Sequence, residues 1–78
     1  MPLRYTLRQL EYFVAVGETG SIAAASHRSN VSSPSISAGI SQLEKELGLK
    51  LFVRNHAQGL TPTPAGLKML GEIGRAHV

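Results

Sequence analysis

Residues 32–48 of this 78-residue chain carry its strongest folding signal, a helix with a marked start, one apolar face and a marked end. Ser32 or Ser33 followed by Pro34 predicts the start, because serine accepts a hydrogen bond from a free backbone N–H and proline in the first turn loses none. The apolar face consists of Ile36, Ile40, Leu43 and Leu47. Gly48 predicts the end. The fold must therefore place a hydrophobic core against one side of this helix.

The opposite face of this helix carries small or polar side chains. They are Ser35, Ser37, Ala38, Gly39, Ser41 and Gln42. A glycine inside a helix costs about 1 kcal/mol relative to alanine, and a merely solvated helix would carry long charged residues, as this one does at Glu44, Lys45 and Glu46. The small face therefore predicts close approach to something bulky. The alternative interpretation is a solvated surface whose serines only cap and turn the chain.

Two helices are predicted before this segment. The first has an apolar face formed by Leu7, Leu10, Phe13 and Val14. Thr6 is its expected N-cap, and two glycines, at positions 17 and 20, bracket its end. The second helix is short, with Ser21 as its cap, and extends from Ile22 to about Arg28. Together with residues 33–47, these segments predict helices joined by tight turns.

After Gly48, the sequence LKLFVR predicts a short strand or extended segment, and NHAQGL predicts a loop with a turn at Gly59. Thr63 and Pro64 repeat the start signal and predict a fourth helix through Leu70. The predicted fold class is mainly α, a winged helix-turn-helix with three helices and a short β wing, followed by the start of a fourth helix.

Composition narrows the range of functions. The chain has no cysteine and 42% apolar residues, enough for one small domain. No apolar run approaches the roughly 20 residues of a membrane span, so we expect a soluble, cytoplasmic protein with no membrane partner. Eight Lys and Arg against five Asp and Glu give a net charge of +3, which suits a polyanion without requiring one.

No catalytic or cofactor-binding pattern is present in the sequence. There is no glycine-rich phosphate loop, and no nucleophile stands at a plausible spacing from a base. His27, His56 and His77 are far apart, which argues against a metal site. We therefore predict that the chain is not an enzyme and has no cofactor.

Residues 72–78, EIGRAHV, carry no convincing apolar period and read like translated adapter sequence. They are predicted to be a non-native tail, with the natural chain ending near Leu70 or Gly71.

Four blocks of sequence carry a family resemblance: LRQLEYFVAV, GSIAAASHRSNVSSPSIS, ISQLEKELGLKLFVR and TPAG. Together they resemble the N-terminal DNA-binding domain of LysR-type transcriptional regulators over residues 5–70. The resemblance implies a winged helix-turn-helix in residues 1–62 and, in 63–71, the start of a linker helix that pairs with its twin in a homodimer. It also implies an effector-binding domain, outside these 78 residues, that would receive a small molecule.

The same resemblance implies double-stranded DNA as the partner, with the recognition helix, residues 33–47, in the major groove. Ser32, Pro34 and Ser37 match the motif at the start of that helix, and Arg54 matches an arginine that contacts phosphate or the minor groove. The candidate DNA-binding residues are Ser32, Ser33, Pro34, Ser35, Ser37, Ala38, Gln42, Arg54 and His56.

This sequence departs from the family pattern at several positions. Ser33 stands where glutamine is usual, and Ala38 and Gly39 stand where longer polar or basic residues are frequent. Ser29 stands where a core leucine is usual, so we expect a loosely docked second helix. Two alternatives to DNA binding are a winged-helix module for protein–protein interaction and an inactive truncated fragment.

Overall fold

The computed structural model describes residues 5–55 and 59–76, and side chains as far as Ile73. Its elements are α1 (Leu7–Thr19), α2 (Ile22–Ser29), α3 (Ser33–Leu47), β1 (Phe52–Asn55), β2 (Gly59–Pro62) and α4 (Pro64–Ala76). Three helices, a two-stranded wing and a fourth helix confirm the predicted mainly α, winged helix-turn-helix fold.

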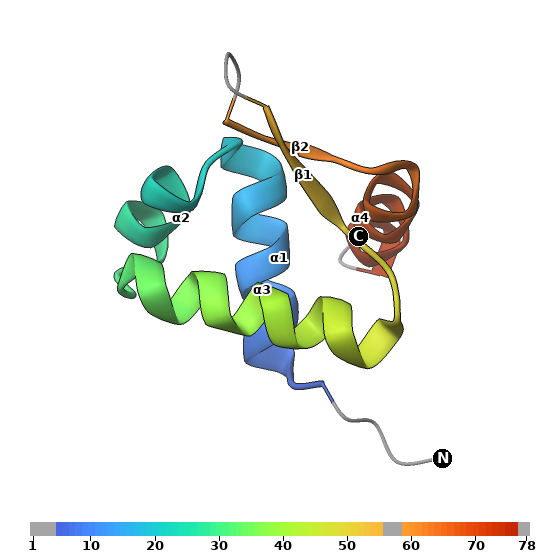
Figure 1. Ribbon diagram of the computed structural model, residues 1–78, viewed down its shortest axis with the longest axis horizontal. Coiled ribbons are helices and arrows are strands. Elements are labelled where there is room, and N and C mark those ends of the chain that lie inside the picture. The colour runs from blue at the N-terminus through green and yellow to red at the C-terminus, as the bar shows by residue number, and fades with distance from the viewer. Residues whose placement is uncertain (1–4, 56–58, 77–78) are drawn as a thin grey trace.

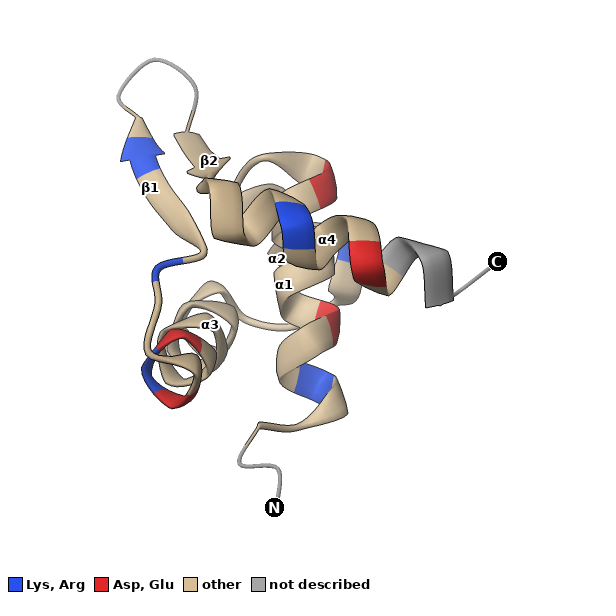
Figure 2. Cartoon of the chain, turned by 90° about the vertical axis from the view of Figure 1, so that its right-hand side faces the viewer, with Lys and Arg blue, Asp and Glu red and all other residues tan. Residues whose placement is uncertain are grey.

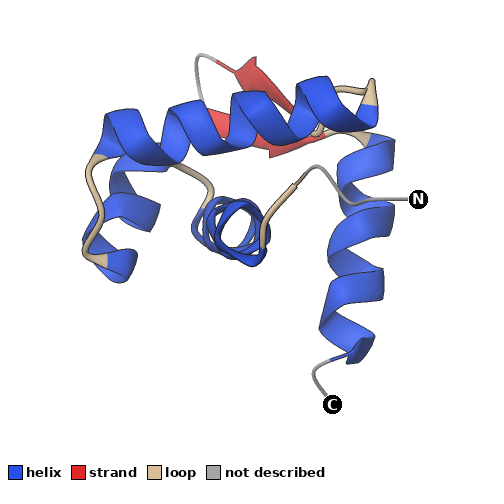
Figure 3. Cartoon of the chain, turned by 90° about the horizontal axis from the view of Figure 1, so that it is seen from below, coloured by secondary structure: helices blue, strands red, loops and turns tan. Residues whose placement is uncertain are grey.

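Helix α1 is the central element of the fold. It lies between α2 on one side and α4 on the other, while α3 crosses it and packs against both α1 and α2 (Figures 1 and 3). The wing covers the end of α1, because the backbone N–H of Leu60 in β2 donates to the carbonyl of Gly20 at 3.1 Å. The wing is thereby fixed to the turn between α1 and α2.

The predicted helix starts are confirmed. Thr6 and Gln9 form a reciprocal capping box, and the Ser21 side chain accepts from the N–H of Ala24 at 3.0 Å. Of the two serines proposed as the cap of α3, Ser32 is the cap and Ser33 is the first helical residue. Local hydrogen-bonding rules therefore place each of these three starts to within one residue.

The helix ends also follow local rules. Gly20 and Gly48 adopt left-handed backbone conformations, with φ of 83° and 71°, and Asn30 ends α2 at φ 56°. Glycine takes this conformation without steric cost, and asparagine tolerates it better than most residues. The short turns at Gly20 and Asn30 bring α1, α2 and α3 together as a compact helix-turn-helix.

Among the described residues, the core contains nine buried side chains from α1, α2, α3, β1 and the segment before β1. They are Phe13, Ala15, Val16, Ala25, Ile36, Ile40, Leu43, Leu51 and Phe52. The predicted apolar face of α3 is confirmed, with Leu47 partly buried. Leu7, predicted to share the apolar face of α1, is 73% exposed. It occupies the first position of α1 and borders an open groove instead of the core.

The groove beside Leu7 lies between α1, the end of α2 and α4, with a volume of about 420 Å³. Ser29, at the end of α2, is half-buried and lines it. A leucine at this position would fill part of the groove, whereas the shorter serine leaves it open. Helix α2 still packs against both α1 and α3, with Ala25 fully buried.

The wing is an antiparallel pair in which Phe52 lies opposite Pro62 and Asn55 lies opposite Gly59. The extended segment predicted by LKLFVR becomes β1 only from Phe52 onward. The loop predicted over residues 55–60 is shorter than expected, because β2 already begins at Gly59, whose φ is 78°. Pairing with β1 imposes this strand on a segment rich in glycine and proline, which sequence rules do not favour as a strand.

Helix α4 starts as predicted. The Thr63 hydroxyl accepts from the N–H of Gly66 at 3.0 Å and donates to the carbonyl of Lys50 at 2.7 Å. The helix continues to Ala76, through the start of the segment expected to be a non-native tail, and Ile73 packs against the core. That segment's origin stays a prediction. Within the described part of the chain, no helix is both long and apolar enough to span a bilayer.

Two glycines of α4 provide a matched test of this packing. A Cβ on Gly66 would overlap the carbonyl oxygen of Leu51, whereas a Cβ on Gly71 would meet nothing within 4 Å. We expect Gly66→Ala to lower the free energy of unfolding by about 1–3 kcal/mol, the usual effect of overpacking. Gly71→Ala should raise it by up to about 1 kcal/mol through helix propensity. Thermal unfolding of both variants measures the difference, and equal stabilities would contradict the close approach of α4 to Leu51.

Candidate nucleic-acid interface

The N-terminus of α3 presents two exposed hydroxyl groups. The Ser32 side chain accepts from the N–H of Ser35 at 3.3 Å, and its hydroxyl donates to the Ser35 hydroxyl at 2.8 Å. The first turn of a helix also has free N–H groups and the positive end of the helix dipole. This end of α3 therefore suits a phosphate or an electronegative base edge.

The outer face of α3 continues this surface along the helix. Its exposed residues are Pro34, Ser35, Ser37, Ala38, Ser41 and Gln42. Ser33 is half-buried, so it is less accessible than its neighbours. The Gln42 amide donates to the Glu46 carboxylate at 2.9 Å, and a partner would have to replace this exposed bond. The structure brings the α3 candidates together on one low-relief surface.

Gly39 lies where α3 packs against α1. It is half-buried at the contact with α1, where an added Cβ would lie 2.7 Å from Cδ2 of Tyr12. The bulky group that a glycine admits here is therefore an aromatic ring of the same chain. At Gly39, the predicted close approach of a bulky group therefore occurs within the chain, in the packing of α3 on α1.

The prediction that Glu44 is a solvated charge is wrong. Its side chain is only 14% exposed, and one carboxylate oxygen accepts backbone hydrogen bonds from Leu51 at 2.7 Å and Phe52 at 3.3 Å. Lys45 is exposed, as expected, whereas Glu46 is half-buried. The position of Glu44, four residues before the helix-ending Gly48, was a signal that it faces the chain leaving the helix.

Basic residues lie in β1 and in the connection between α3 and β1. Figure 2 shows Lys and Arg residues, in blue, both in β1 and in the connection that leads into it. Arg54 in β1 is exposed, and among the described residues it has no ion-pair partner. Lys50 is 79% exposed and lies 3.9 Å from Glu44. His56, the remaining candidate, lies outside the described residues.

Arg28 differs from Arg54 in its surroundings. Its guanidinium lies 2.6 Å from the carboxylate of Glu18, and both side chains are about half exposed. Exposed pairs of this kind add little to stability. The pair nevertheless balances the charge of Arg28 within the chain, which makes Arg54 the better candidate for binding an external anion. The described residues contain no group of three or more His, Cys, Asp or Glu side chains arranged to hold a metal ion.

Residues 7–67 match the family described as bacterial regulatory helix-turn-helix protein, lysR family. The chain belongs to this family. The resemblance found in the sequence is thus confirmed, and membership of a family of regulatory proteins confirms the prediction that the chain is not an enzyme.

Among curated relatives, the chain is 46% identical over 68 residues to the transcriptional regulator ClcR of Pseudomonas putida, covering 87% of this chain and 23% of ClcR. It is 40% identical over 70 residues to the transcriptional activator LysR of Escherichia coli, and the match covers 90% of this chain and 22% of LysR. The chain therefore spans about a quarter of the length of these relatives.

Solved structures agree with this assignment. The crystal structure of a complex between the DNA-binding domain of CbnR and DNA matches with a TM-score of 0.83 and 42% identity, over 91% of this chain and 80% of that chain. The crystal structure of CbnR, a LysR family transcriptional regulator, matches with a TM-score of 0.84 over 91% of this chain and 24% of that chain.

The capping role of Ser32 is testable apart from any partner. We expect Ser32→Ala to lower the free energy of unfolding by about 1 kcal/mol, because the N–H of Ser35 loses its acceptor. Ser32→Asn should retain nearly all the stability, since asparagine also caps helices. Ser37→Ala, an exposed serine in the same helix, is the control and should change stability by less than about 0.5 kcal/mol. Equal losses in Ser32→Ala and Ser37→Ala, measured by chemical denaturation, would rule out the cap.

Proposed function

We propose that this chain binds double-stranded DNA sequence-specifically, as the DNA-reading part of a LysR-type transcription regulator. In the proposed complex, α3 lies in the major groove and the wing lies beside it. The observation that carries the proposal is the outer face of α3, which is exposed, small and rich in hydroxyl groups, while its inner face is fixed by the core. The match to the CbnR DNA-binding domain supports the same assignment.

The dimensions of DNA favour this arrangement. The major groove of B-DNA is about 12 Å wide and admits one α-helix. Because no outer-face side chain from Ser35 to Ser41 is longer than serine, the backbone of α3 can approach the base edges closely. Ser35, Ser37 and Gln42 offer donors and acceptors for these edges, and the methyl group of Ala38 can contact a thymine methyl. Ser32, Ser33 and Pro34 lie at the first turn, next to the DNA backbone.

Binding energy in this complex comes mainly from contacts to phosphates. Arg54 on β1 has an exposed guanidinium suited to a phosphate or the minor groove, and Lys45 and Lys50 are exposed nearby in sequence. His56, in the connection between the two wing strands, is proposed as an additional contact to the DNA backbone. With a net charge of only +3, the affinity depends on a few correctly placed cations.

We also propose a homodimer formed through α4 in a longer cytoplasmic protein. In this organisation, residues 1–62 read DNA, residues 63–71 begin the linker helix and residues 72–78 are non-native. A small-molecule effector would bind a further domain. The exposure of Leu67, which is 60%, supports pairing through α4, because Leu70 on the same helix packs instead at Gly17 of α1.

Selection from a pool of random duplexes at two salt concentrations tests the proposed function. We expect enrichment of an interrupted palindrome, with affinity falling steeply as salt rises because bound phosphates release counterions. The Ser33→Gln variant, with the glutamine usual in the family, should enrich a different sequence. No enrichment at low salt would exclude sequence-specific binding and favour a protein partner, and an identical site for Ser33→Gln would show that residue 33 reads no base.

The role of Arg54 has a separate test. Arg54→Ala should weaken binding about tenfold on every duplex, the magnitude of one lost charged hydrogen bond, and reduce the salt slope by about one. Lys68→Ala removes the same charge from an exposed position on α4 and is the control, expected to change affinity less than about twofold. Fluorescence anisotropy over a salt series measures both variants. Equal losses of affinity in the two variants would mean that binding depends on the net charge of the chain and not on the position of Arg54.

A further inference from the structure

The chain that connects α3 to the wing is held by one residue. Glu44 accepts four backbone N–H groups within residues 48–52: its carbonyl accepts from Gly48 at 2.9 Å and Leu49 at 3.2 Å. Its carboxylate accepts from Leu51 at 2.7 Å and Phe52 at 3.3 Å. The first two bonds end the helix. The last two extend beyond it, to the first residue of β1.

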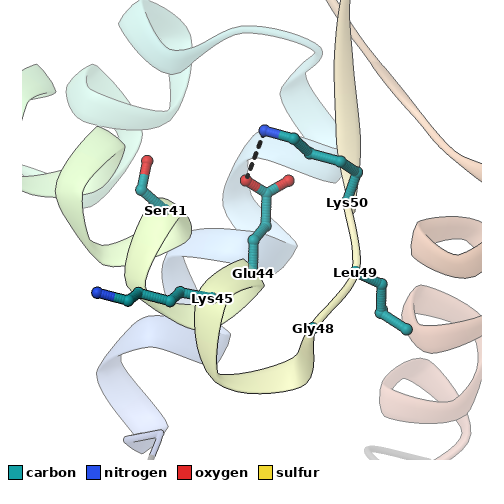
Figure 4. A pocket seen from close by; sticks show the side chains of 6 residues that line it. All are labelled: Ser41, Glu44, Lys45, Gly48, Leu49 and Lys50. Atoms are coloured by element: carbon teal, nitrogen blue, oxygen red, sulfur yellow. Dashed lines mark ion pairs between the residues drawn. The ribbon is translucent and has the colours of Figure 1, made fainter.

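The side chain of Glu44 is suited to fix the position of the connection between α3 and β1. It projects from the last turns of α3 toward the connection before β1 (Figure 4) and is only 14% exposed. A charged acceptor forms hydrogen bonds to N–H groups about twice as strong as a neutral one does, and partial burial strengthens them further. Lys50 adds little, because it lies 3.9 Å away and is 79% exposed. The two backbone bonds are therefore the main link from this carboxylate to the wing.

These bonds link α3 to the start of the strand that carries Arg54. The strand β1 starts at Phe52, and Arg54 follows two residues later on the exposed part of the wing. Other contacts hold the wing to the rest of the fold: Phe52 packs on Phe13, and β2 donates to Gly20. They tie the wing to α1 and its following turn, whereas the Glu44 carboxylate ties it to α3.

We propose that Glu44 is a positioning residue for DNA binding, which holds the wing in register with α3 so that both engage one duplex together. The contribution of Arg54 to affinity then depends on Glu44, although Glu44 itself does not touch DNA. This inference rests on the proposed function. Since removing a negative charge alone would raise affinity for DNA, a loss of affinity on truncating Glu44 has the opposite sign from a simple electrostatic effect.

A double-mutant cycle tests this coupling in the full 78-residue chain. Arg54→Ala is measured in three backgrounds: wild type, Glu44→Ala and Glu44→Gln. We expect Arg54→Ala to weaken binding about tenfold in the wild type but less than about threefold in Glu44→Ala. Glu44→Ala alone should weaken binding. Glu44→Gln keeps a carbonyl acceptor for both N–H groups, so it should preserve most of the Arg54 effect.

Val14→Ala is the control for general loss of stability, because Val14 packs against the core from α1, outside the wing. All variants are measured at a temperature at which thermal unfolding shows them folded. The Arg54 effect should remain about tenfold in Val14→Ala. An equal Arg54 effect in Glu44→Ala and the wild type, or undiminished affinity of Glu44→Ala, would overturn the proposed coupling.

Amide hydrogen exchange without DNA separates this inference from the proposed function. The N–H groups of Leu51 and Phe52 should exchange faster in Glu44→Ala than in Val14→Ala, and at nearly wild-type rates in Glu44→Gln. Unchanged exchange would overturn the role of Glu44 whether or not the chain binds DNA. Failure of the wild type to bind any duplex, with exchange altered as expected, would instead overturn the proposed function and the coupling to Arg54, leaving Glu44 as an anchor of the wing only.

Discussion

The contact between Phe13 and Phe52 joins the two halves of this fold. They are the only phenylalanines of the chain, both are buried, and their ring centroids lie 5.4 Å apart at an interplanar angle of 53°. A two-stranded hairpin alone is marginally stable in water. Because its first residue, Phe52, inserts into the core beside the central helix, the wing is anchored to the hydrophobic core. The position of Arg54, the basic residue of β1, depends on this packing.

The parts of the structure that local chemistry dictates were predictable from the sequence. Caps at Thr6, Ser21 and Ser32 and the turn at Gly48 need only a side chain and its immediate backbone. The exposed face of α3 was also predictable, since burial of its apolar face leaves the opposite face outside. For the same reason, the α3 candidates could be expected to share one surface, where the structure places them.

The features that the sequence did not reveal depend on partners distant in the chain. Gly39 indicates close approach of a bulky group, but that group is identified only when Tyr12 of α1 is placed against it. Glu44 resembles a surface charge until the chain turns at Gly48 and brings the N–H groups of Leu51 and Phe52 to its carboxylate. Strand β2 arises by pairing with β1, against its own composition. Periodicity and capping rules describe single segments, and these three cases are contacts between segments.

Leu51 is the point at which the three elements proposed to determine DNA recognition meet. Its side chain is fully buried, its N–H donates to Glu44 of α3, and its carbonyl accepts from the N–H of Thr63 at the start of α4. The same carbonyl lies against Gly66, which leaves no room for a larger residue in α4. Helix α3, the wing and the start of α4 therefore all contact or continue from the peptide segment around Leu51. A shift of α4 would act on this segment directly, so the proposed dimer through α4 and the proposed contact of Arg54 with DNA would be linked through Leu51.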